Sequence, residues 1–300
     1  MRFICLENED IDRDRWDYLI DTSSIPQVYA KSWMLDAFSP GWSALVGNDW
    51  NWIMPLPVSK KWRIPYLVQP IFFQQLGIFS QNPVAENTIH EVMSYLSKHF
   101  PFVRYQFNRS NQLEKLSDRI TTRQTFELDL TKGYEDIKRG FSQSHRKNIN
   151  KCFNRGVVVY SSSDLTEHLN LMQAMYKKMN VSAVKDRHYQ MFRKIADYGI
   201  RNTGSRLYYA INGRGAIIGS AFFLRSGKQF IIFTVRSVEG IENRCTFVLV
   251  DNFLREECGS GNYLDFAGSD IPGIAEFNAG WGAINYVYLR YSNQWLPFNM

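Results

Sequence analysis

Three consecutive runs of β-branched and aromatic residues constrain the fold more than any other feature of the chain. The runs are Arg206–Ile211, Ala216–Leu224 and Gln229–Arg236. Asn212-Gly213 separates the first two runs and Ser226-Gly227 the last two, and both dipeptides favour tight hairpin turns. The sequence therefore predicts a three-stranded antiparallel meander.

Helical and strand-like segments alternate around this meander. Before it lie a strand at 125–130, one or two helices within 133–155, a strand at 157–160 and helices at 165–176 and 186–198. After it come a helix through 247–254, a strand at 263–266, a helix at 271–278 and a strand at 284–291. This order predicts an α/β fold in which a mixed, mostly antiparallel central sheet is flanked by helices.

The first part of the chain shows a separate set of elements. Helices are expected at 10–20, 32–38 and 89–96, and strands at 42–46, 51–57 and 103–107. Because the pattern starts again near residue 125 and 300 residues exceed one typical domain, we expect two domains, 1–125 and 126–300.

Composition narrows the classes of protein. The 35 basic and 29 acidic side chains give a net charge of +6, which suits an anionic ligand such as a nucleotide, a coenzyme or tRNA. No apolar run is long enough to cross a bilayer, and the acidic start differs from a secretory signal. The four cysteines form no CxxC pair and the five histidines show no metal spacing, so we expect a cytoplasmic protein without a metal site.

The most unusual segment is the basic stretch at 141–159. On a helix, Lys147, Lys151 and Arg155 lie four residues apart and share one face, while Ile149 points to the opposite side. Such a ridge attracts phosphate through charge-assisted hydrogen bonds. A solvated cationic face is the other interpretation, and the spacing alone leaves both open.

A second segment, 263–291, places a carboxylate beside the start of a helix. Asp265 ends a strand, and Ser269 or Asp270 is placed to cap the helix that Ile271-Pro272 opens. A carboxylate there suits the orientation of a substrate. A purely structural strand–turn–helix corner accounts for the same residues.

A third segment joins the last strand of the meander to the next helix. Thr234 and Arg236 end that strand, and amides at a helix start are suited to bind a pyrophosphate. The glycine-rich form of such a loop is lacking, because Gly240 stands alone between Glu239 and Glu242, which repel phosphate. This composition argues against ordinary acetyl-CoA binding.

Two of these segments together resemble a known family. The basic helix SQSHRKNINK followed by DFAGSDIPGIAEFNAGWGA resembles FemX-like aminoacyl and acyl transferases, over about residues 126–290. The resemblance implies tandem GNAT-like domains of the acyl-CoA N-acyltransferase fold. It also implies transfer of an acyl group from aminoacyl-tRNA or acyl-CoA to an amine on a small-molecule or nucleotide-linked acceptor, such as a cell-wall precursor.

The resemblance also suggests site residues. Arg146 and Lys147 match the basic helix of the family, and Asp265, Gly268, Ser269 and Phe277 match the second block. Many relatives look to have lysine where this chain has Asn278, and asparagine carries no charge.

We therefore expect Asp265 to orient or deprotonate the amine and Arg236 to hold the oxyanion. The residues expected to bind substrate are Arg146, Lys147, Lys151, Thr234, Ser269, Phe277 and Asn278. Two alternatives stay open, a non-catalytic module that binds a nucleotide or tRNA and a small-molecule N-acetyltransferase that uses acetyl-CoA.

Overall fold

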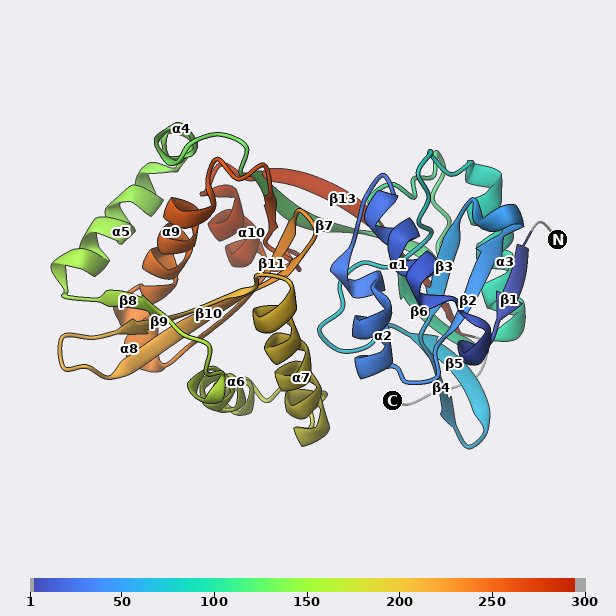
Figure 1. Ribbon diagram of the computed structural model, residues 1–300, viewed down its shortest axis with the longest axis horizontal. Coiled ribbons are helices and arrows are strands. Elements are labelled where there is room, and N and C mark those ends of the chain that lie inside the picture. The colour runs from blue at the N-terminus through green and yellow to red at the C-terminus, as the bar shows by residue number, and fades with distance from the viewer. Residues whose placement is uncertain (1–2, 295–300) are drawn as a thin grey trace. The chain divides into compact units, whose positions relative to one another are not determined.

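The computed structural model describes residues 3–294, which form two compact units (Figure 1). Unit 1 consists of the described residues up to Gln124 together with Tyr286 to Gln294, and unit 2 is Thr125–Asn285. From the sequence, every residue after 125 was expected in the second domain. From Tyr286 on, the last strand instead belongs with unit 1, because residues in this part pair with an earlier strand of that unit, for example Tyr291 with Tyr105.

Unit 1 has helices on a small antiparallel sheet. Its helices are α1 (Arg13–Thr22), α2 (Ser32–Phe38) and α3 (Glu86–His99), with 3-10 turns at Asn8–Asp10, Val28–Ala30 and Asn48–Trp50. Three strands pair in the order β1 (Phe3–Leu6), β2 (Ser43–Gly47) and β3 (Ile53–Leu56). Helix α1 forms where predicted because Asp12 caps it, accepting from the amide of Arg15 at 3.0 Å, and because Trp16 and Ile20 are buried one turn apart.

A second set of strands completes unit 1. It runs in the order β4 (Val58–Lys61), β5 (Ile64–Val68), β6 (Phe102–Gln106) and β13 (Ile284–Gln294). The β5–β6 pair is parallel and the other two pairs are antiparallel. The β4–β5 hairpin was not anticipated from the sequence.

Unit 2 contains the meander and the helices that cover it. Its helices are α4 (Tyr134–Arg139), α5 (Gln143–Asn154), α6 (Thr166–Lys178), α7 (Asp186–Asn202), α8 (Val238–Glu242), α9 (Cys245–Glu257) and α10 (Pro272–Ala279). Its strands are β7 (Ile120–Asp129), β8 (Val158–Ser161), β9 (Arg206–Ile211), β10 (Ile217–Ser226), β11 (Gln229–Arg236) and β12 (Tyr263–Asp265), of which β7 belongs to this unit from Thr125 on. The predicted meander is β9–β10–β11, and its strands pair antiparallel.

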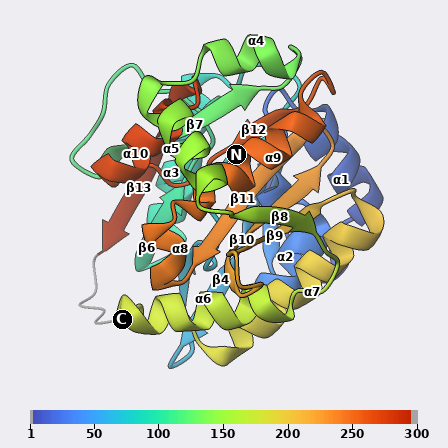
Figure 2. The ribbon, with the colours of Figure 1, turned by 90° about the vertical axis from the view of Figure 1, so that its left-hand side faces the viewer.

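The sheet of unit 2 runs in the order β7-β12-β11-β10-β9-β8. Only the β11–β12 pair among these described strands is parallel, so the sheet is mostly antiparallel, as predicted. Figures 1 and 2 show α5 and α9 on one side of the strands and α6 and α7 on the other. Successive side chains of β10 pack against helices on opposite faces of the sheet. Phe223 stacks on Phe253 of α9 at 3.8 Å between ring centroids, and Phe222 makes an edge contact with Phe192 of α7.

None of the described helices is long and apolar enough to cross a membrane.

Candidate functional site

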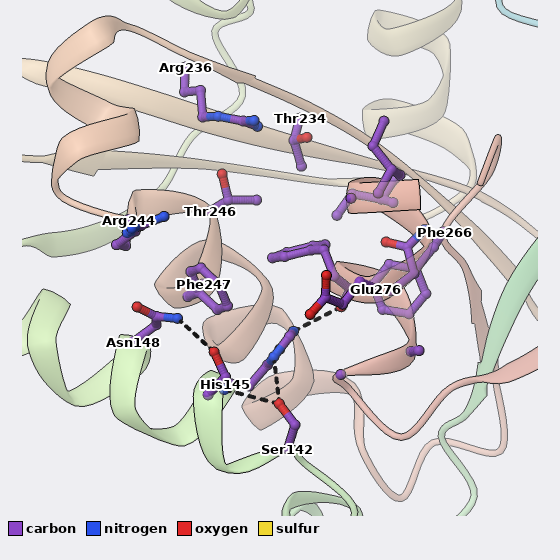
Figure 3. Close-up of a pocket in the computed structure, with 18 of the residues that line it drawn as sticks. Ser142, His145, Asn148, Thr234, Arg236, Arg244, Thr246, Phe247, Phe266 and Glu276 are labelled. Atoms are coloured by element: carbon purple, nitrogen blue, oxygen red, sulfur yellow. Dashed lines mark hydrogen bonds between the residues drawn. The ribbon is translucent and has the colours of Figure 1, made fainter. Parts of the chain in front are cut away.

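A cavity of about 750 Å³ lies within unit 2 (Figure 3). Its walls come from α5, the end of β11, the α8–α9 corner and α10. Polar side chains that line it are Ser142, Ser144, His145, Asn148, Thr234, Arg236, Arg244, Thr246, Glu276 and Asn278. Apolar ones are Ile232, Ile241, Phe247, Phe266, Ile274, Phe277 and Ala279. A concave site with an apolar lining and a few convergent polar groups is typical of a small-molecule or cofactor site.

The α5 wall begins at a helix cap. Ser142 is the N-cap, and its hydroxyl oxygen accepts from the amide of His145 at 3.1 Å. The next turn places Asn148 on the cavity side, where its amide nitrogen is 3.4 Å from the hydroxyl of Ser144. This wall therefore offers hydroxyl and amide groups to a ligand.

His145 joins the α5 wall to the α10 wall. Its Nε2 lies 2.8 Å from the carbonyl oxygen of Phe277, and its Nδ1 lies 2.9 Å from the hydroxyl of Ser142. Because a carbonyl only accepts, Nε2 carries the hydrogen, and neutral Nδ1 accepts from the Ser142 hydroxyl. Burial lowers the pKa of His145 more than the Phe277 carbonyl and the Glu276 carboxylate raise it. The ring is a neutral, fixed link between two walls.

Aromatic rings surround this link. The ring centroid of His145 lies 4.9 Å from that of Phe247, 5.3 Å from that of Phe277 and 4.8 Å from that of Trp281. Trp281 is fully buried and does not line the cavity. Gly280 is required beside them, because a Cβ at that position would overlap the imidazole of His145.

The α10 wall carries the carboxylate of the site. Glu276 is exposed, and it is the single acidic residue among the described residues that line the cavity. Asn278, two residues later, is 3% exposed and donates from Nδ2 to the hydroxyl of Ser269 at 2.8 Å. Asn278 is therefore held by a neutral hydrogen bond at the position where the family resemblance implied a lysine.

The opposite part of the cavity is cationic. Arg236 ends β11, and Arg244 directly precedes α9 (Figure 3). The first turn of α9 has no acidic residue, so its amides and helix dipole reinforce the two guanidinium groups. Glu239 points elsewhere, since it accepts from Asn212 at 2.7 Å and pairs with Arg214 at 3.4 Å, and neither it nor Glu242 lines the cavity. The carboxylates expected to repel phosphate are thus outside the lining.

The structure brings four of the predicted site residues together. Thr234, Arg236, Phe277 and Asn278 all line the cavity. Ser269 is fully buried beneath Asn278 and supports it without lining the cavity.

The three predicted cations of α5 are placed differently. Arg146, Lys147 and Lys151 are exposed and do not line the cavity, and Arg146 donates to the carbonyl of Phe141 at 2.8 Å. Ile149 lies on the buried side of α5, as predicted from its spacing. That side also carries His145, so the face that enters the cavity lies beside the ridge.

Asp265 does not lie in the cavity. Its side chain is fully buried in the sheet, where its carboxylate accepts from Thr125 Oγ1 at 2.6 Å and from the amide of Ala267 at 2.9 Å. Gln229 Nε2 lies 3.4 Å from its other oxygen. These bonds join β7, β11 and the turn after β12. They give Asp265 a structural position, which is the second interpretation that the sequence left open.

His145, Arg244 and Glu276 were missed as site residues. A signal for His145 was present, because it shares a helical face with Ile149 and Cys152, the buried face of α5. Glu276 follows Ile274 within α10, and no pattern distinguished it from a solvated charge. The backbone of Arg244, just before α9, is in the left-handed region with a φ of 61°, and the local sequence does not predict this conformation.

The comparisons with known proteins concern the fold. No protein-family model and no curated protein sequence matches the chain. Among solved structures, FemX superposes with a TM-score of 0.65 at 12% identity, covering 96% of this chain and 97% of that one. The chain has the fold of FemX.

Two further solved structures agree. A GNAT-family acetyltransferase from Colwellia psychrerythraea gives a TM-score of 0.55 at 8% identity over 98% of this chain and all of that one. The L-PGS of Bacillus licheniformis gives 0.52 at 11% identity over 93% of this chain and 91% of that one. These matches establish an α/β fold of the GNAT and FemX type along nearly the whole chain.

Proposed function

We propose that the protein transfers an acyl or aminoacyl group from an activated donor to an amine, and that the cavity of unit 2 is where the reaction occurs. The observation that carries the proposal is the charge arrangement of this cavity. One part of the cavity is cationic and consists of Arg236, Arg244 and the first turn of α9. The other part contains Glu276, the single acidic residue among the described lining residues. The transferase-type fold supports the same conclusion.

The cationic part suits the phosphates of the donor. Acyl-CoA and aminoacyl-tRNA both carry phosphate groups, and arginine binds phosphate with several charge-assisted hydrogen bonds. The hydroxyls of Thr234 and Thr246 line the same region and offer neutral donors. From the sequence, Arg236 was expected to hold the oxyanion. In this proposal it binds the negatively charged phosphate of the donor instead.

Glu276 takes the role that the sequence analysis gave to Asp265. The acceptor amine loses a proton to the Glu276 carboxylate, and its nitrogen attacks the carbonyl carbon of the donor. The tetrahedral intermediate then collapses to an amide and releases the coenzyme thiol or the tRNA hydroxyl, which takes up the proton. His145 and the aromatic rings hold the α10 wall in place, so that Glu276 stays in reach.

Direct measurement of transfer tests this proposal. The purified protein is incubated with labelled acetyl-CoA, longer acyl-CoAs or charged tRNA, together with amines that include a lysine-containing peptide and a nucleotide-linked muropeptide. We expect one donor to give a labelled amide. Glu276→Gln should abolish most turnover while donor binding persists, and Arg236→Gln should weaken donor binding.

Lys147→Gln is the matched control, because this cation lies on α5 outside the cavity. Equal losses in Lys147→Gln and Arg236→Gln would contradict the assignment of the donor to the cavity. Full turnover in Glu276→Gln would show that Glu276 is not the base that accepts the proton of the amine.

A second candidate function is a non-catalytic module that binds a nucleotide or tRNA. The neutral, buried Asn278 favours it, because the charge that relatives look to have at this position is replaced by a hydrogen bond to Ser269. Salt-sensitive binding of a phosphate ligand without amide formation from any donor would favour this function over transfer.

A further inference from the structure

The β4–β5 hairpin of unit 1 has an unusual tip. Lys61 of β4 pairs with Ile64 of β5, so a two-residue turn made of Trp62 and Arg63 connects the strands. Figure 1 shows the hairpin extending past the other labelled elements of that unit. The tip is thus a convex, projecting point.

Trp62 is presented to solvent at this tip. Its side chain is 83% exposed, the largest fraction among the big hydrophobic residues that the structure describes as exposed. A tryptophan ring is ordinarily a major contributor to a core or an interface, because of the apolar area that it buries. At the tip the ring contributes little to the fold of unit 1.

The backbone of the turn also argues against a purely structural reason for these residues. Trp62 and Arg63 have φ values of 50° and 66°. Two-residue hairpin turns of this kind favour Asn-Gly, because left-handed φ is unfavourable for residues with larger side chains. Asn-Gly would form the same turn with less strain, so stability does not explain why tryptophan and arginine occupy it.

The charged side chains of this hairpin all have one sign. Lys60, Lys61 and Arg63 are the sequence neighbours of Trp62, and the hairpin from Val58 to Val68 contains no acidic residue. The ammonium nitrogen of Lys61 lies 5.0 Å from the centroid of the Trp62 ring. The tip therefore combines an amphipathic aromatic ring with a compact positive charge.

We propose that this hairpin tip docks unit 1 on a membrane surface that contains anionic lipids. Tryptophan favours the headgroup region of a bilayer, and each lysine or arginine beside it is attracted to a negatively charged leaflet. A projecting tip can place the ring at that depth without any spanning helix. The inference does not depend on the reaction proposed for unit 2.

Nucleic acid is the other polyanion with which such a tip is compatible, and the geometry favours it less. Binding of single strands uses successive aromatic platforms along a charged groove. The tip offers one ring, and Lys61 lies against it. The next aromatic residue of the hairpin, Tyr66, is half-buried in β5.

Vesicle co-sedimentation of the full chain tests the proposal. We expect binding to phosphatidylcholine vesicles that contain phosphatidylglycerol, little binding to phosphatidylcholine alone, and a loss of binding at high salt. Lys60→Gln should weaken binding about fivefold, as expected for one cation at an anionic surface. Tyr18→Ala, another exposed aromatic of unit 1 at 62% exposure, should bind like the wild type.

A turn-optimised variant separates binding from folding. The double substitution Trp62→Asn and Arg63→Gly should raise the melting temperature, because Asn and Gly adopt the left-handed φ of this turn with less strain. It should nevertheless lower vesicle binding more than fivefold, because one cation and the ring are lost. Vesicle binding that survives in this variant would overturn the proposal. So would binding of single-stranded RNA, in place of vesicles, with the same dependence on Trp62 and Lys60.

Discussion

The imidazole of His145 occupies the space that a side chain at Gly280 would need. A Cβ built on Gly280 would overlap three atoms of that ring, while the ring itself bonds to Phe277 O and to Ser142. Two walls of the candidate site thus meet at one close contact, with α5 supplying the ring and the end of α10 supplying the space.

Gly280→Ala should destabilise the protein by about 1–3 kcal/mol, because the added methyl group forces His145 out of its place. Urea unfolding measures the change. Gly273→Ala is the matched control within α10, since a Cβ there meets no atom within 4 Å. If the overlap is the cause, His145→Ala combined with Gly280→Ala should cost less than the two single substitutions added together.

The two carboxylates, Asp265 and Glu276, should respond oppositely to amide substitution. Asp265→Asn should lower the free energy of unfolding by about 1–3 kcal/mol, because the new NH₂ group faces the donors of Thr125 or Ala267. Glu276→Gln should change stability by less than about 0.5 kcal/mol, because the side chain is exposed. Denaturant unfolding alongside a transfer assay checks both. A stable Asp265→Asn variant without activity would return Asp265 to a catalytic role.

Arginine substitutions should reveal where an anionic ligand binds. Arg236→Gln and Arg244→Gln should each weaken binding of a phosphate-bearing donor by about tenfold, since each removes a hydrogen bond from a charged group. Calorimetric titration at two ionic strengths measures the effect, and the salt dependence should become shallower in both variants. If Lys151→Gln, outside the lining, has a larger effect than either arginine substitution, the exposed ridge is the main anion site.

Acid should destabilise unit 2 through His168. This side chain is fully buried, its Nδ1 lies 2.5 Å from the hydroxyl of Ser220, and burial lowers its pKa to about 3. Below pH 6.5 the unfolded chain binds a proton that the folded protein does not, so stability falls as the pH falls from 6.5 toward 3. At pH 5 this group alone should remove about 2 kcal/mol.

Unfolding curves at pH 7.5 and pH 5 test this expectation. His168→Gln should be less stable at neutral pH, yet lose less stability on acidification than the wild type. His90→Gln, on an exposed turn of α3, should keep the full pH dependence. Equal acid sensitivity of the wild type and His168→Gln would show that another group dominates.

The sequence predicted the elements that depend on local signals. The meander was predicted because hairpin dipeptides separate apolar runs. Helix α9 was predicted from its apolar spacing, and α10 from the Ile271-Pro272 start that follows a capping residue. The β4–β5 hairpin was not, because Trp62 and Arg63 adopt a turn that their residue types disfavour. A local sequence pattern predicts a turn only where the residue types favour the backbone conformation of that turn.

The candidate site depended more on tertiary arrangement. Phe277 and Asn278 were expected at the site because they belong to a segment that carried the family resemblance, and Thr234 and Arg236 because they end the strand before a helix start. Asp265 was expected beside the reactants, because a strand-end carboxylate looks the same in sequence whether it faces a cavity or, as in this structure, the partners Thr125 and Gln229, the former 140 residues away. Helical spacing identified the cationic side of α5, and the choice of which side meets the cavity required α9 and α10.

The return of the chain to unit 1 through β13 has a practical consequence for dissection of the protein. Unit 2 is one continuous segment, whereas unit 1 is assembled from both flanking stretches. A truncation at residue 125 would leave β6 with an unpaired edge, so the fragment should be prone to aggregation. Both boundaries of unit 2 fall inside strands, after Gln124 in β7 and before Tyr286 in β13, so a fragment designed to express unit 2 should include the whole of both strands.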